Sequence, residues 1–137
     1  MTRLVQVVFS VIVLLALCVG TIVAQSKFVP PIRGEAEIAV LPTVTKVDAK
    51  TNMVVTTIKV KNISTAGSIA GLRVDGYWYD KANELVTGSR ARLPKPLLPG
   101  EVAELKLEIP KDPKMFRDQY VFAHANGKIK TKQVKSF

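Results

Sequence analysis

The chain has 137 residues, with 20 basic and 11 acidic side chains and a formal net charge of +9. This length leaves room for one domain of about a hundred residues behind an apolar N-terminus, and it excludes a second domain. The positive charge favours anionic partners, such as phospholipid headgroups or an acidic protein surface. The one cysteine, Cys18, lies in the apolar segment, so the rest of the chain can form no disulfide and no cysteine-ligated metal site.

Residues 1–24 are predicted to form one hydrophobic helix. Leu4 to Ala24 is apolar apart from a few small polar residues and carries no charge, and about twenty such residues can span a bilayer. Cleavage after Ala24 would make the segment a signal peptide, retention would make it a transmembrane anchor, and lipidation of Cys18 is a third option. Each option places the domain outside the cytoplasm, on the periplasmic side, either anchored to the inner membrane or secreted after cleavage.

Residues 25–34 contain two consecutive prolines, Pro30 and Pro31, and are predicted to form an extended tether. Residues 35–137 are predicted to form the folded domain. Its first strand, residues 35–47, is interrupted by Pro42, as is typical of an edge strand. In residues 52–62, four side chains that alternate along the chain point to one face, namely Val54, Thr56, Ile58 and Val60.

The stretch from Ile69 to Asp80 is predicted to be the central strand of the domain. Its residues alternate from Leu72 onward, which is the pattern of a half-buried strand. Trp78, the one tryptophan of the chain, falls on the apolar face and is predicted to anchor the core. The opposite face carries Arg73, Tyr77 and Tyr79, a combination enriched at protein-binding hot spots, so these three are candidates for contact with a partner.

The remaining strands are predicted at residues 84–90 and 102–109 and in a terminal hairpin, residues 120–126 and 128–134, with Asn126 and Gly127 as its turn. About seven short strands at near-regular spacing, without helical periodicity after the N-terminus, predict an all-β fold. We expect an antiparallel sandwich rather than an α/β fold.

Several of these features together resemble a known family. Lys59-Val60-Lys61-Asn62 ends one strand, Tyr79-Asp80 closes the central strand, and Leu98-Pro99-Gly100-Glu101 precedes a later strand. In order and spacing this resembles the bacterial extracytoplasmic domains called FxLYD, over residues 52–125. Gly76 stands where the family has phenylalanine, and Trp78 where it has leucine. The resemblance implies an immunoglobulin-like sandwich outside the cytoplasm, generally without catalytic residues.

No catalytic or metal-binding set is expected in the sequence. His124 is the one histidine, and a base or metal ligand needs partners that the chain does not supply nearby. We therefore predict no enzyme activity, no catalytic or metal residue and no cofactor. Asn62-Ile63-Ser64 fits the glycosylation sequon, which matters only in a secretory pathway that glycosylates.

The C-terminal end is rich in basic residues. On a terminal strand such lysines protect an edge from aggregation, and they also suit contact with an anionic surface, either lipid headgroups or an acidic protein. Nucleic acid is an unlikely partner, because the aromatics are not interleaved with the lysines. The candidates for an anionic-surface contact are Lys114, Arg117, Lys128, Lys130, Lys132 and Lys135.

These observations favour a non-catalytic extracytoplasmic module that acts by binding. The leading hypothesis is a membrane-tethered accessory subunit of a membrane protein complex or envelope assembly. The alternative is a periplasmic sandwich that binds or senses a small ligand, in a cavity beside Gly76 and Trp78.

Overall fold

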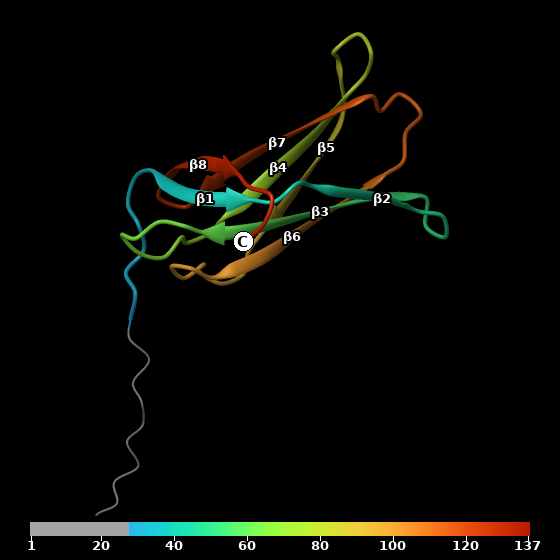
Figure 1. Cartoon of the computed structure of the whole chain (residues 1–137). Coiled ribbons are helices and arrows are strands. Elements are labelled where there is room, and N and C mark those ends of the chain that lie inside the picture. Colours follow the sequence, from blue (N-terminus) through green and yellow to red (C-terminus); the bar gives the residue numbers. More distant parts are fainter. Residues whose placement is uncertain (1–27) are drawn as a thin grey trace, which may run out of the picture.

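A computed structural model describes residues 28–137, and every regular element in that range is a β-strand (Figure 1). No helix in this range is both long and apolar enough to cross a membrane. The helix predicted for residues 1–24, including Cys18, lies outside the described residues. The strands are β1 (Ala36–Val40), β2 (Val44–Asp48), β3 (Met53–Asn62), β4 (Arg73–Tyr79), β5 (Leu85–Arg92), β6 (Val102–Pro110), β7 (Arg117–His124) and β8 (Gly127–Gln133).

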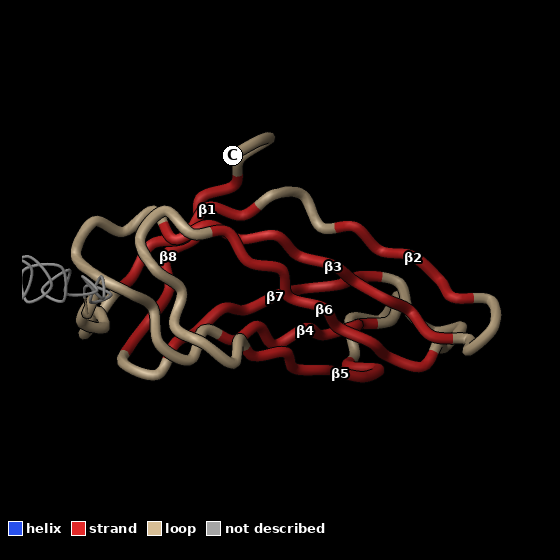
Figure 2. Tube along the Cα trace, turned by 90° about the horizontal axis from the view of Figure 1, so that it is seen from below, coloured by secondary structure: helices blue, strands red, loops and turns tan. Residues whose placement is uncertain are grey.

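The eight strands form one curled sheet, a half-barrel, in the order β2-β3-β1-β8-β7-β4-β5, with β6 paired to β3 off this path. Figure 2 shows the strands running along the length of the molecule, with the loops gathered at its two ends. The predicted all-β class is confirmed. Eight strands occur because the predicted break at Pro42 separates β1 from β2, which pair with successive stretches of the same strand β3.

One pairing in the sheet differs from the antiparallel arrangement that we predicted. β8 runs parallel to β1 over five residue pairs, from Ala36–Ile129 to Val40–Gln133. Within the described residues, β8 pairs with β7 at only two positions. The predicted terminal hairpin is therefore short, and its turn is Ala125-Asn126, because Gly127 already pairs with His124.

The core lies between the inner faces of the curled sheet. Its alternating residues on β3 were predicted correctly, since Val54, Thr56, Ile58 and Val60 are all buried. The largest fully buried side chains come from four strands and from two of the connections between strands. They include Ile38, Ile58, Ile69, Leu72, Leu97, Leu105 and Leu107.

Trp78 is not the anchor of this core, contrary to our prediction. It is half-buried, and it belongs neither to the buried cluster nor to the side chains packed against it. The face was assigned correctly, because Val74 and Gly76 on the same side are buried. Trp78, however, sits beside an irregularity in the β4–β5 register, at the end of the strand. Aliphatic side chains fill the centre instead.

The predicted tether is wrong for its last residues. Ile32 is 7% exposed and belongs to the core cluster. Its amide donates to the Ser68 carbonyl at 2.8 Å, and the Ser68 amide donates to the Pro30 carbonyl at 3.0 Å. The folded domain therefore includes residues 30–34, where a lone isoleucine between Pro31 and Arg33 gives no periodic signal in the sequence.

Candidate binding surface

The two faces of β4 carry different kinds of side chain. On the inner face, a Cβ built on Gly76 would lie 2.8 Å from Leu107 Cδ1 and 3.2 Å from Tyr120 Cε1. These two side chains fill the space beside Gly76, where the alternative function required a ligand-binding cavity. The outer face of β4 carries Arg73, Asp75, Tyr77 and Tyr79, as the alternation predicted for the arginine and the tyrosines.

Asp75 is the acidic centre of this outer face, and two arginines hold it. Arg90 lies opposite Asp75 on β5, and its Nε donates to Oδ1 of Asp75. The Nε of Arg73 lies 3.6 Å from Oδ2 of the same carboxylate. The hydrogen bond and the negative charge of Asp75 raise the pKa of the Arg90 guanidinium. One carboxylate thus faces two cations, and the group keeps a net positive charge.

The two tyrosines are fixed in different ways. The ring of Tyr77 lies across Gly88 of β5, where a Cβ would come within 3.2 Å of Tyr77 Cδ1. The ring of Tyr79 lies under the guanidinium of Arg117, whose Cζ is 4.5 Å from the ring centroid. Arg117 also donates from Nη2 to Asn83 in the β4–β5 turn. Both rings are half-buried, so each presents one side to solvent.

The strand register carries the basic C-terminal strand to the same outer face. Residues directly opposite each other in a sheet point to the same side. Arg73 is opposite Ala123, and Ala123 is opposite Lys128, so the outward side chains of β8 share the face of Arg73 and the tyrosines. The basic side chains at the outward positions are Arg73, Arg90, Arg92, Arg117, Lys128, Lys130 and Lys132.

Two acidic residues lie among these basic side chains. Among the described residues at the outward positions of β4, β5, β7 and β8, Asp75 is the one acidic side chain. Lys130 reaches Glu37 on the neighbouring β1 at 3.6 Å. We call the outward residues of these four strands the basic face. Two groups that the sequence treated separately, the tyrosine group and the lysine group, therefore belong to one surface.

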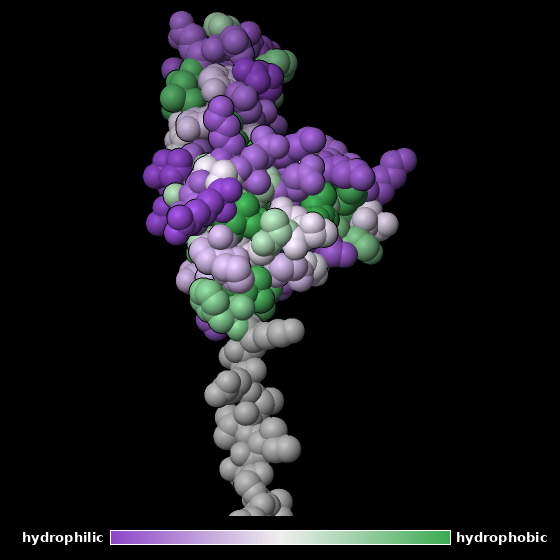
Figure 3. Space-filling view, turned by 90° about the vertical axis from the view of Figure 1, so that its left-hand side faces the viewer, coloured by the Kyte–Doolittle hydropathy of each residue, from purple (hydrophilic) through white to green (hydrophobic). Residues whose placement is uncertain are grey.

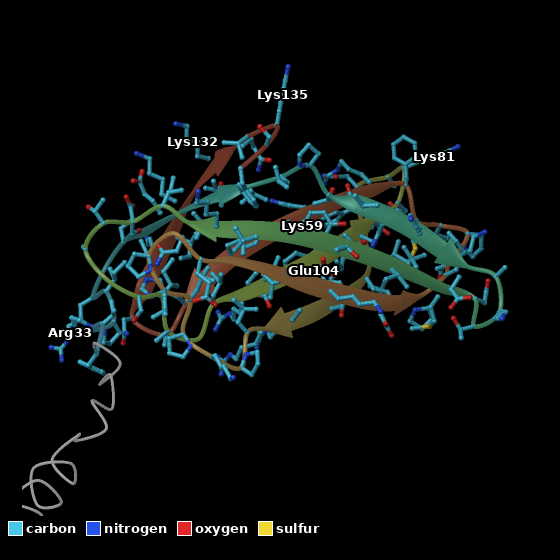
Figure 4. The ribbon with its side chains drawn as sticks, turned by 60° about the horizontal axis from the view of Figure 1, so that its bottom comes forward. Arg33, Lys59, Lys81, Glu104, Lys132 and Lys135 are labelled. Carbon is cyan, nitrogen blue, oxygen red and sulfur yellow. The ribbon has the colours of Figure 1, made fainter. Side chains whose placement is uncertain are left out.

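The outer face of β2, β3 and β6 is different. There, cations and carboxylates alternate across the register, as in the pair of Lys59 and Glu104, which lie side by side in Figure 4. Lys106 contacts Glu108 at 3.2 Å. Charge is therefore balanced on this face. The excess of positive charge is concentrated on the basic face.

Two of the predicted contact residues lie elsewhere. Lys114 borders a hollow of about 370 Å³ in the corner before β7, together with Lys81 and the exposed Phe116. Lys135 follows β8 and projects beside Lys132, far from Lys81 (Figure 4). Arg117 begins β7, whereas Lys128 of β8 lies opposite Ala123 near the other end of β7. At the rise of an extended strand these two positions are about 20 Å apart. The six candidates therefore do not form one compact patch.

His124 has a structural role. It is 6% exposed, its Nε2 donates to the Gly34 carbonyl at 2.7 Å, and its Nδ1 accepts from the Asn126 amide at 3.4 Å. Both ring nitrogens are thus occupied in tying residues 30–34 to the end of β7. Within residues 28–137, no three histidine, cysteine or acidic side chains lie close enough together to hold a metal ion.

No protein-family model and no curated protein matches the chain. One solved structure to which the chain is similar is IrmA from Escherichia coli. Its TM-score is 0.49 at 9% sequence identity, and the match covers 74% of this chain and 94% of that one. A likeness at this level says nothing about what the chain binds.

Arg90 and Arg92 belong to this surface but were not predicted as members of it. Their spacing was visible, since Arg90 and Arg92 alternate with Ser89 and Ala91 near the end of a predicted strand. Their role was not visible, because it depends on which strand lies beside which. Only the pairing of Arg90 with Asp75, and of Arg92 with Arg73, brings them to the tyrosines.

Proposed function

We propose that this protein is a non-catalytic, extracytoplasmic binding module, tethered to a membrane as an accessory subunit of a membrane protein complex or envelope assembly. The observation that carries the proposal is the basic face. Cations gather on one side of the sheet around two half-exposed tyrosines, whereas the other side is charge-balanced. Aromatic and arginine side chains on a surface of one sign are suited to an acidic protein partner.

The proposed fold is an immunoglobulin-like sandwich. In its support, β1 pairs with β3 on one edge and with β8 on the other. The curled sheet can therefore be divided into a half with β6, β3 and β1 and a half with β8, β7, β4 and β5. Contact between Gly76 of one half and Leu107 of the other fits two layers over a common core.

The proposed location is the periplasmic side of the inner membrane. Its support is the apolar stretch from Leu4 to Ala24, followed by Phe28, which is 84% exposed at the start of the described chain. Figure 3 views this end of the molecule, where hydrophobic residues gather beside the beginning of the described chain and hydrophilic residues cover most of the rest.

A small-ligand carrier was the alternative function. The space beside Gly76 holds Leu107 and Tyr120, so no observation favours that alternative at the site where it was expected. Anionic lipid headgroups remain a second class of partner for the lysines of β8, since they bind clustered basic side chains without needing the tyrosines.

Gentle solubilisation of membranes tests the proposed function. The full chain, carrying a C-terminal tag, is expected to co-purify with a defined membrane protein in mild detergent and to lose it as the salt concentration rises, because surface charges are screened. Flotation with anionic vesicles tests the lipid alternative in parallel. A protein that is solitary in every detergent, and that floats with anionic vesicles alone, would contradict the accessory-subunit proposal.

A further inference from the structure

β7 and β8 separate soon after the turn that joins them. β7 pairs with β4 along its whole length, from Arg117 to Ala123. It pairs with β8 at Ala123 and His124 alone within the described residues. Beyond these positions β8 turns toward β1 and the C-terminus (Figure 2). We call the opening between the two strands the wedge. Its β7 side, residues 117–122, carries main-chain groups without a strand partner in residues 28–137.

The wedge leads into a hollow rather than into a filled core. The hollow measures about 470 Å³ and is lined from three strands. Asp118, Tyr120 and Phe122 border it from β7, Thr131 and Gln133 from β8, and Val40 from β1. Its walls are thus partly polar, and the Tyr120 hydroxyl there donates to Asp118 at 2.8 Å. An added strand could place every second side chain into this space.

Hydrogen bonds on both outer sides hold the wedge open. β8 is committed to β1 over five pairs, which continue in the bond from the Val134 amide to the Val40 carbonyl at 3.0 Å. β7 is committed to β4. Closing the wedge would break one of these ladders, whereas an entering strand would break neither. Unpaired strand edges of this kind are templates for β-strand addition.

The charges around the wedge indicate what could enter it. Lys130 and Lys132 stand at outward positions on the β8 side and are exposed, with Lys130 3.6 Å from Glu37 of β1. On the β7 side Arg117 is also exposed, and its guanidinium lies over Tyr79 of β4. A second copy of this chain would bring another net charge of +9 to the same place, which opposes self-pairing. An extended segment with acidic side chains facing outward and uncharged side chains facing the hollow would complement both.

We propose that the wedge accepts an extended acidic segment of a partner protein as an added β-strand, paired to the free edge of β7. This inference goes beyond the proposed function. It rests on main-chain groups at an edge, whereas the proposed function rests on side chains of the basic face, so each can fail without the other.

A defined peptide tests the proposal. The probe is an eight-residue peptide of alternating glutamate and valine, added to the full chain in detergent micelles. Hydrogen exchange is expected to slow by about tenfold or more at saturation for the amides in residues 117–122 that face the wedge rather than β4, as these amides become paired. The amides of β3 serve as the internal reference. Unchanged exchange in residues 117–122 at saturating peptide would overturn the proposal.

Two methylated peptides separate main-chain pairing from side-chain attraction. One carries N-methyl groups on its valine amides and the other on its glutamate amides, with all charges kept. Alternate amides of a strand face opposite edges, so at least one of the two should bind about tenfold or more weakly. If neither methylation weakens binding, the contact runs through side chains and strand addition is wrong.

Charge variants complete the test. Lys132→Glu, at the rim of the wedge, should weaken the peptide several-fold, while Lys59→Glu, on the charge-balanced face, should leave its affinity unchanged. Equal weakening by both substitutions would mean unspecific attraction to net charge and would overturn the assignment to the wedge. Both residues are exposed, so both variants are expected to fold.

Discussion

Asn62 shows how much one buried polar residue can organise. It is fully buried, and its Nδ2 donates to the carbonyls of Gly67 at 3.1 Å and Leu97 at 3.0 Å, while its Oδ1 accepts from the Ser64 amide. The sequence presented it as a glycosylation sequon, but the side-chain nitrogen is occupied and shielded from solvent. In the folded domain this residue joins two loops and cannot carry a glycan.

Replacing Asn62 is therefore expected to be costly. In Asn62→Ala the buried carbonyls of Gly67 and Leu97 lose their donor, which should lower the free energy of unfolding by about 3 kcal/mol. Asn126→Ala is the matched control, because Asn126 is exposed and should change stability by less than about 0.5 kcal/mol. Urea unfolding measures both, and equal midpoints for the two variants would refute the role of Asn62.

The raised pKa of Tyr120 predicts how the free energy of unfolding changes at alkaline pH. Burial raises its pKa above the ordinary value of 10.0, with a weaker contribution in the same direction from its bond to Asp118. Above about pH 10 the unfolded chain therefore releases this proton before the folded one, so stability falls as the pH rises through that range. Tyr120→Phe should remove this component, making the loss of unfolding free energy between pH 9 and pH 11 smaller than in the wild type. Parallel curves for the two proteins would contradict it.

At the scale of elements, sequence patterns located most strands but not their partners. Alternation placed β3 and β6 almost to the residue, because each has one buried and one wetter face. β4 begins at Arg73, four residues after the predicted start, and Asp75 on its outer face is buried as well. It could not reveal that β8 joins β1 in parallel, since Lys128, Lys130 and Lys132 alternate in the same way beside either neighbour. The basic face depends on the pairing of β4 with β5 and with β7, which alternation does not reveal either. For this reason its residues were predicted singly and its extent was not.

The docking of residues 30–34 against the end of β7 gives an element-scale prediction. A Cβ on Gly127 would lie 2.3 Å from the Gly34 carbonyl oxygen, so Gly127→Ala must push this segment away and disturb the contact of His124 with Gly34. We expect a loss of more than about 2 kcal/mol in thermal unfolding.

Gly100→Ala is the control for this prediction. Gly100 has a φ of +77° but nothing within 4 Å of an added Cβ, so it should lose only the backbone term, about 1 kcal/mol. A Gly127 variant no less stable than the Gly100 variant would show that residues 30–34 are not held there.

At the scale of the whole molecule, charge separates the two outer surfaces of one curled sheet. The face of β2, β3 and β6 pairs its lysines with glutamates, while the face of β4, β5, β7 and β8 concentrates arginines and lysines around Tyr77 and Tyr79. Composition predicted an anionic partner but not the surface that would bind it, because net charge does not say where the charges lie. The register shows on which strands the basic side chains gather.

The most direct test of binding through the basic face compares two double charge reversals in the full chain, by co-purification from gently solubilised membranes. Arg92→Glu with Arg117→Glu alters the basic face, and Lys46→Glu with Lys59→Glu makes the same change in net charge on the other face, all at exposed positions. We expect the first pair to lose the partner and the second pair to retain it. Retention by both, or equal loss by both, would contradict the claim that the basic face is where this protein binds.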